Sequence, residues 1–106
     1  MHVNADDLAV SNNEAAGRYE AHVDGQLALV AYQRAGDQII YIHTEVPEEL
    51  EGQGIAGRMT HVALEDARAQ RLSVVPQCPF VASYIERHPE YKDLVSPAVF
   101  IDDAQA

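Results

Sequence analysis

The sequence predicts a single α/β domain of the α+β type, with a mixed, mostly antiparallel sheet and two main helices. Three apolar, β-branched segments joined by short turns come first, which is typical of an antiparallel meander. A helix, a short strand and a second helix follow, and such a strand–helix–strand passage favours parallel pairing. With 106 residues, 47% of them hydrophobic, the chain can build one modest core, with residues 1–9 and 96–106 at its periphery.

The first half of the chain predicts three strands. Residues 1–14 are polar, and the run Ser11-Asn12-Asn13-Glu14 predicts a loop or turn. Residues 18–23 alternate apolar and polar side chains, as in a half-buried strand, and Asp24-Gly25 predicts a hairpin turn. The next two strands are expected at residues 27–32 and 38–43, with a turn at residues 35–37 between them.

The second half predicts two helices. Residues 44–51 form a connector, after which apolar residues recur at helical spacing until about Gln70. Residues 72–75 predict a short strand that Pro76 ends, and residues 79–88 predict a helix between Pro79 and Pro89. One further short strand is expected at residues 99–101.

Composition narrows the function classes. Seven basic and seventeen acidic residues give a formal net charge of −10, which argues against nonspecific binding to nucleic acid or anionic membranes. Solubility is the simplest reason for this charge, and basic or amine partners suit it better than anionic ones. The start of the chain has no signal-peptide pattern, and its one cysteine, Cys78, cannot form an internal disulfide. A cytoplasmic location is therefore expected, and the five scattered histidines predict no metal site.

The run from Glu51 to Gly57 predicts a phosphate-binding loop at the start of a helix. Glycines let a ligand approach the main chain, and the free N–H groups of a helix N-terminus favour anions. Gly52, Gly54 and Gly57 fit the dinucleotide pattern G-x-G-x-x-G, but no strand directly precedes them and no acidic residue follows near Val74. No Gly-Lys-Ser/Thr follows either, which excludes a P-loop.

The order of meander, Val46-Pro47, glycine run, helix, strand and helix resembles the GNAT acyltransferase superfamily. Its signature is Gln/Arg-x-x-Gly-x-Gly/Ala, which falls here on residues 51–56 and departs from the pattern at Glu51. The chain is also similar, over about residues 10–95, to a very small GNAT-like family of predicted acetyltransferases. Three runs carry this second resemblance: residues 43–47, 52–56 and 76–91.

The resemblance implies acetyl-CoA or coenzyme A as cofactor and acetyl transfer to an amine, either a small molecule or a protein lysine or N-terminus. Compared with full-length members, the chain is short, so the acceptor site is expected to be open, suited to a protein amine, or completed by a second subunit in a homodimer. The implied cofactor-binding residues are Val46, Glu51, Gly52, Gln53, Gly54, Ile55, Ala56, Gly57 and Arg58.

Four residues are candidates for the chemistry. His43 and Glu45 are alternative general bases at the end of the central strand. Tyr84 matches the tyrosine that protonates the departing thiolate in larger members of the superfamily, although Phe80, Tyr84 and His88 also fit a plain packing stripe. Cys78 lies at a helix N-cap, where the helix dipole favours the thiolate.

Cys78 leaves three functions open: an acyl-accepting nucleophile, a thiol that pairs with coenzyme A, or a buried core residue. The alternative to an acetyltransferase is therefore a noncatalytic coenzyme A binding or thiol-sensing module that uses Cys78. A structural domain with a vestigial loop is a third possibility.

Overall fold

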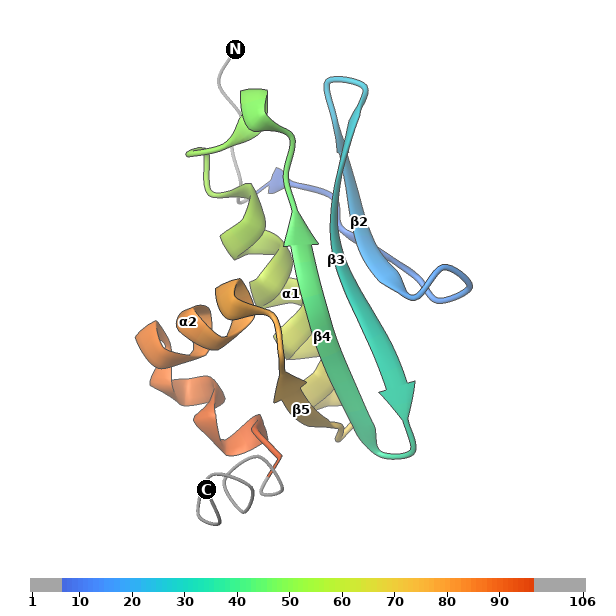
Figure 1. The fold of residues 1–106 in the computed structure, drawn as a ribbon, viewed down its shortest axis with the longest axis vertical. Helices are drawn as coiled ribbons and strands as arrows, with labels where there is room; N and C mark the ends of the chain where they lie inside the picture. The colour runs from blue at the N-terminus through green and yellow to red at the C-terminus, as the bar shows by residue number, and fades with distance from the viewer. Residues whose placement is uncertain (1–6, 97–106) are drawn as a thin grey trace.

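The computed structural model describes residues 7–96 and contains one five-stranded sheet in the order β1-β2-β3-β4-β5 (Figure 1). The first four strands are antiparallel and β5 is parallel to β4, so the predicted mixed, mostly antiparallel sheet with two main helices is confirmed. The strands are β1 (Ser11–Asn13), β2 (Arg18–Val23), β3 (Gln26–Ala35), β4 (Gln38–Glu45) and β5 (Ser73–Pro76). The helices are α1 (Ile55–Ala69) and α2 (Pro79–Arg87), with the 3-10 helices η2 (Glu48–Leu50) and η3 (Pro89–Leu94).

One hydrophobic core lies between the sheet and the helices. Tyr41 of β4 is fully buried, and its hydroxyl donates a hydrogen bond of 2.9 Å to the carbonyl oxygen of Ala63 in α1. Tyr19 of β2 donates likewise to the carboxylate of Asp66 in α1. Because successive side chains of a strand point to opposite faces, the neighbours of these tyrosines lie on the other face of the sheet.

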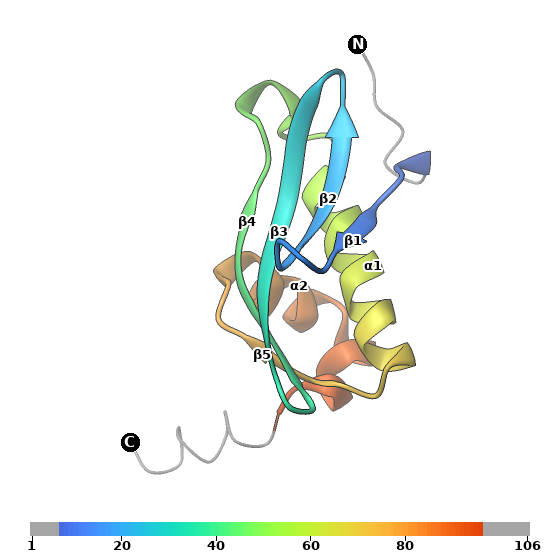
Figure 2. The same cartoon turned by 90° about the vertical axis from the view of Figure 1, so that its right-hand side faces the viewer.

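Helix α1 lies on the right of the strands in Figure 2, and the opposite face of β2 and β3 has no helix of residues 7–96 packed against it. Register fixes which side chains share it: Arg18 pairs with Ala31 and Ala31 with His43, while Glu20 pairs with Leu29 and Leu29 with Glu45. We call this surface the open face. It is formed by Arg18, Glu20, His22, Leu27, Leu29, Ala31, Ile40, His43, Glu45 and Val75.

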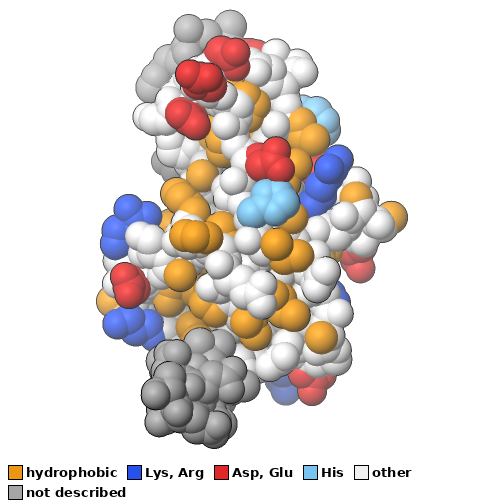
Figure 3. All heavy atoms as spheres, viewed as in Figure 1, with side chains coloured by type: hydrophobic (Ala, Val, Ile, Leu, Met, Phe, Trp, Pro, Cys, Tyr) orange, Lys and Arg blue, Asp and Glu red, His pale blue; other side chains and the backbone are white. Residues whose placement is uncertain are grey.

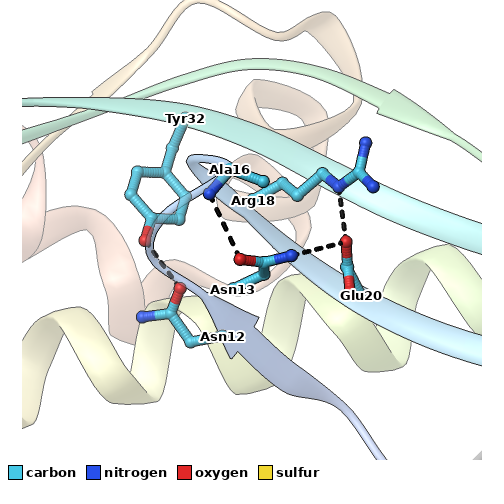
Figure 4. A network of polar contacts seen from close by, with 6 residues as sticks. All are labelled: Asn12, Asn13, Ala16, Arg18, Glu20 and Tyr32. Atoms are coloured by element: carbon cyan, nitrogen blue, oxygen red, sulfur yellow. Dashed lines mark hydrogen bonds and ion pairs between the residues drawn. The ribbon is translucent and has the colours of Figure 1, made fainter.

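The first strand corrects the loop predicted for residues 11–14. Its pairing with β2 is supported by polar side chains: Asn13 Nδ2 donates to Glu20 Oε2 at 3.1 Å, and the Tyr32 hydroxyl donates to Asn12 Oδ1 at 2.6 Å (Figure 4). Arg18 Nε donates to the same Glu20 oxygen at 2.5 Å. A three-residue polar strand held in this way has no apolar alternation to reveal it.

Several boundaries also differ from the prediction. The strand expected at residues 27–32 extends to Ala35, and the next one extends past His43 to Glu45. Both 3-10 helices were missed, because each lies in a proline-containing segment that predicts only a connector. The expected strand at residues 99–101 lies outside the described residues.

Candidate functional site

The site begins where β4 and β5 separate. Their parallel pairing runs from Gln38↔Ser73 to Tyr41↔Pro76, whereas β4 continues to Glu45. The consecutive residues Ala31 and Tyr32 of β3 pair with His43 and Tyr41 of β4, which are not consecutive. Ile42 lies between them as an extra residue and marks a β-bulge. A bulge bends the strand that carries it. Because β5 ends at Pro76 while β4 stays paired with β3 as far as Glu45, a slot is left beside the last residues of β4.

The second helix forms the other side of this slot. After β5 the chain turns, and the backbone N–H of Cys78 donates to the carbonyl oxygen of Tyr41 at 2.8 Å. Pro79 then begins α2, as the sequence predicts from proline at a first helical position. The N-terminus of α2 is thereby held against β4 at the point where the strands diverge.

The glycine run forms the floor of the slot. Gly52 and Gly54 have φ angles of 83° and 81°, the left-handed region that glycine adopts without strain. Gly54 is the N-cap of α1 and supplies no side-chain cap, so the first N–H groups of the helix keep their capacity to bind an anion. The backbone therefore has the geometry of a phosphate cradle.

A pocket of about 390 Å³ lies above this cradle. Of the nine residues that the sequence assigns to the cofactor, seven line it, and Gln53 and Arg58 do not. Thr44, Leu50 and Phe80 also line the pocket, and of these the sequence pattern indicates only Phe80, as part of a helical stripe. The complete lining is Thr44, Val46, Leu50, Glu51, Gly52, Gly54, Ile55, Ala56, Gly57 and Phe80.

Arg58 lies in the first turn of α1, directly after the pocket-lining residues. Its Nε is buried and has no hydrogen-bond partner within residues 7–96. A buried N–H without an acceptor costs about 1–3 kcal/mol, so this atom has unmet capacity for an anionic ligand.

Cys78 is buried, with 2% of its surface exposed, and belongs to the hydrophobic core. Its Sγ lies 3.3 Å from the hydroxyl oxygen of Thr44, which lines the pocket. The thiol is thus one side chain away from the pocket. Cys78 is therefore a buried core residue, whereas its two reactive functions, as an acyl-accepting nucleophile or as a thiol that pairs with coenzyme A, remain predictions.

Tyr84 borders the pocket without lining it. Its ring stacks on that of His88, with centroids 3.9 Å apart, and a methyl group at Gly57 would lie 3.8 Å from its Cε2. Burial raises the pKa of the Tyr84 phenol, so this group is protonated at neutral pH. His88 Nδ1 lies 2.9 Å from the carbonyl oxygen of Tyr84, which fits the packing interpretation of this histidine.

His43 and Glu45 form a pair on the open face. Nε2 of His43 lies 2.7 Å from Oε2 of Glu45, and about half or more of each side chain is exposed. Thr44 lies between them in sequence and faces the pocket instead. The two candidate bases therefore lie together, across the strand from the pocket.

Residues 7–96 contain neither a candidate metal site nor a helix that could span a membrane. No group of three His, Cys, Asp or Glu side chains is placed to hold a metal ion. In the same residues, no helix has the length and apolar character needed to span a membrane.

The fold and the cradle are those of the GNAT superfamily, and the comparison with known proteins agrees. Residues 18–94 match the family of GCN5-related N-acetyl-transferases, to which this chain belongs. The resemblance inferred from the sequence is therefore confirmed.

The chain is similar to Protein NATD1 of Mus musculus, with 29% identity over 95 residues, 85% of this chain and 86% of that protein. Protein NATD1 of Homo sapiens is 29% identical over 73 residues, 66% of this chain and 65% of that protein. The solution NMR structure of a GCN5-like protein from Staphylococcus aureus superimposes with a TM-score of 0.67 at 26% identity, covering 85% of this chain and 89% of that one.

Proposed function

We propose that this protein transfers an acetyl group from acetyl-CoA to an amine. The observation that carries the proposal is the pocket at the slot between β4 and α2, floored by two left-handed glycines at the N-terminus of α1. The membership of the GCN5-related family supports it independently. The single cysteine supports a cytoplasmic location as part of the same proposal.

The residues present fit coenzyme A. Backbone N–H groups from Gly52 to Gly57 would hold the pyrophosphate, since no capping side chain forms a hydrogen bond at the start of α1. Arg58 has a buried N–H that lacks an acceptor and lies one residue past the pocket lining. The backbone of residues 44–46, at the slot, would hold the arm that carries the thioester. The cofactor supplies the acetyl group in activated form.

The remaining chemistry belongs to the side chains around the slot. Acetylation of an ammonium group replaces the C–S bond of the thioester by an N–C bond. Tyr84, protonated at neutral pH, would donate its proton to the departing thiolate. Of the two protons that leave the nitrogen, one would pass through the His43–Glu45 pair to solvent and the other would restore the Tyr84 phenol.

A titration with acetyl-CoA, followed by thermal unfolding, tests the proposal. Binding to the native state stabilises it by about 2.7 kcal/mol at a ligand concentration of 100 times Kd. Gly54→Glu places a carboxylate in the cradle and should abolish this gain. Gly25→Glu is the matched control, because Gly25 has a similar φ of 78° and open space around it in a hairpin turn far from the pocket. Equal gains in both variants would contradict the proposal.

The second candidate, a coenzyme A binding or thiol-sensing module, is favoured by the position of Cys78 Sγ at 3.3 Å from a pocket-lining hydroxyl. It predicts that oxidised coenzyme A forms a mixed disulfide, visible as a mass increase that Cys78→Ser removes. It also predicts that no amine is acetylated. Acetylation of any amine by the Cys78→Ser variant would favour the acetyltransferase over the thiol-sensing module. It would also show that acetyl transfer does not require the Cys78 thiol.

A further inference from the structure

The segment after α2 carries a group of polar side chains that the mechanism above does not use. Its centre is Tyr91 of η3, which is 2% exposed. The Tyr91 hydroxyl donates a hydrogen bond of 2.6 Å to Glu65 Oε2, and its oxygen lies 2.9 Å from His61 Nδ1. Because a hydroxyl has a single proton, the hydrogen of the second bond comes from His61, which therefore carries a proton on Nδ1.

Arg68 holds the same segment one turn further along α1. Its Cζ lies 5.8 Å from the centroid of the Tyr91 ring, and its Nη2 donates to the carbonyl oxygen of Glu90 at 2.7 Å. His61, Glu65 and Arg68 are spaced at i, i+4 and i+7, so they form one stripe on α1. This stripe attaches η3 to the helix that begins at the cradle.

Tyr91 also contacts the proposed proton donor. The centroid of its ring lies 6.2 Å from that of Tyr84, with 31° between the two planes. His88 stacks on Tyr84 at 3.9 Å, and Gly57 of the cradle lies at its ring edge. The Tyr84 ring is thus enclosed by its own helix, by η3 and by the first turn of α1, and these contacts set its orientation.

The anchored hydroxyl restrains this arrangement. A hydrogen bond to an ionised carboxylate is roughly twice as strong as one between neutral groups, so the bond to Glu65 strongly opposes movement of the Tyr91 ring. Gly57 lines the pocket, and His61 stands one turn after it on α1. Tyr91 therefore connects Tyr84 to α1 close to the level at which the cofactor would bind.

Charges of both signs surround Tyr84. Figure 3 shows basic side chains on either side of an acidic one at its left edge, where α2 and η3 lie in Figure 1. Burial is the largest cause of the raised pKa of Tyr84. Glu90 and Glu65 raise this pKa further, and Arg58 and Arg87 lower it. Because the charges oppose one another, the pKa of the phenol reports mainly how closely its ring is packed.

We propose that Tyr91 is a positioning residue for acetyl transfer, because its hydroxyl, anchored on α1, fixes the Tyr84 phenol beside the cradle. The effect on catalysis rests on the function proposed above, whereas the effect on the position of Tyr84 does not. A proton donor must lie within hydrogen-bond reach of its acceptor. A loosened Tyr84 therefore protonates the departing thiolate less often, while acetyl-CoA binds to the cradle as before.

The kinetic test uses acetyl-CoA and a short lysine peptide with a free N-terminus. Tyr91→Phe keeps the ring and should lower kcat about tenfold, which corresponds to about 1.4 kcal/mol, without changing KM for acetyl-CoA. In a Tyr84→Phe background the same substitution should cause no further fall, because nothing is left to position. Tyr32→Phe is the matched control, since it removes a hydroxyl that donates at 2.6 Å to Asn12, outside the pocket lining, and should leave kcat unchanged.

Three kinetic results would overturn the proposal: an unchanged kcat in Tyr91→Phe, a rise in KM for acetyl-CoA in place of the fall in kcat, or additive losses in the double variant. Substitutions of His61 separate the hydrogen bond from packing. His61→Asn retains a donor near the position of Nδ1, whereas His61→Leu has none. The kcat of the asparagine variant should lie closer to that of the original protein, and equal values in the two variants would overturn the anchor on α1.

NMR of the tyrosine-labelled protein without cofactor tests the position of Tyr84 by itself. The chain has five tyrosines, so Tyr84→Phe identifies the Tyr84 signals. Tyr91→Phe should speed the flipping of the Tyr84 ring and bring the pKa of its phenol closer to the usual 10, whereas Tyr32→Phe should do neither. Unchanged Tyr84 signals in Tyr91→Phe would overturn the proposal whether or not the protein acetylates an amine.

Discussion

Gly57 offers a prediction in which stability and function change in opposite directions. It is the third residue of α1 and, unlike Gly52 and Gly54, does not have a left-handed φ. Glycine in a helix interior is about 0.8–1.0 kcal/mol less favourable than alanine. The methyl group of Gly57→Ala would lie 3.8 Å from Tyr84 Cε2, an ordinary van der Waals distance, so the neighbouring helix need not move.

We therefore expect Gly57→Ala to raise the free energy of unfolding by about 1 kcal/mol and the Tm by about 4–8 °C, as for domains of this size. Urea unfolding followed by circular dichroism measures the change. Gly25→Ala is the control, because the same methyl group at a φ of 78° costs about 1–2 kcal/mol and should lower the stability. A loss of stability in Gly57→Ala would refute the reasoning, since it would mean that Tyr84 leaves no room.

The same methyl group should weaken cofactor binding. Gly57 lines the pocket, and an added carbon there separates the ligand from the cradle. A tenfold rise in Kd corresponds to a stabilisation by acetyl-CoA that is smaller by about 1.4 kcal/mol at a fixed ligand concentration. If acetyl-CoA raises the Tm of the variant and the original protein equally, the ligand does not approach Gly57.

Three further predictions follow from single contacts. Tyr41→Phe removes a buried hydrogen bond of 2.9 Å to Ala63 and should lower the stability by about 1 kcal/mol in denaturant unfolding; no change would mean that the bond contributes nothing. Arg58→Met keeps the aliphatic stem but removes the unpartnered Nε, so the unliganded protein should be no less stable. The Kd for acetyl-CoA should rise, and calorimetry measures both the stability and the Kd. An unchanged Kd would mean that Arg58 does not contact the cofactor. Hydrogen bonds, first from Arg18 and then from Asn13, hold the pKa of Glu20 below its usual 4.5 in the folded protein, so the ionised carboxylate stabilises the fold. This stabilisation is fully present above pH 4.5 and is lost as the pH falls through the lower pKa of the folded state. The stability difference between the original protein and Glu20→Gln should accordingly shrink below pH 4.5, and a difference that is constant with pH would contradict the ion pair.

Most of the fold could be predicted because its elements have clear patterns. Alternation along residues 18–23 fixes both a strand and its buried face, and tight turns fix the antiparallel order. The first strand could not be predicted, since Ser11–Asn13 has three polar residues and depends on contacts with Glu20 and Tyr32 that only the folded chain provides.

The site was predictable only in part, for a similar reason. Gly52 and Gly54 are informative in sequence because left-handed φ angles favour glycine. The slot exists because β5 ends at Pro76 while β4 continues to Glu45, a difference in strand length that depends on pairings formed only in the folded chain. The contact of Thr44 with Cys78 joins residues 34 positions apart, and no local pattern indicates it. The pairing of His43 with Glu45 follows from strand alternation, which puts residues i and i+2 on one face.

The acidity of the chain and the anionic cofactor proposed for it can coexist because they act over different distances. Backbone N–H groups at a helix N-terminus bind an anion within the first turn. Carboxylates at the rim act over a Debye length of about 8 Å at physiological ionic strength. Glu51 stands where the GNAT signature has Gln or Arg, so the side chain at that position adds to the acidic rim rather than to the cradle. In the proposed complex, the phosphates would be held by the main chain of the cradle and by Arg58, and not by the side chain of residue 51.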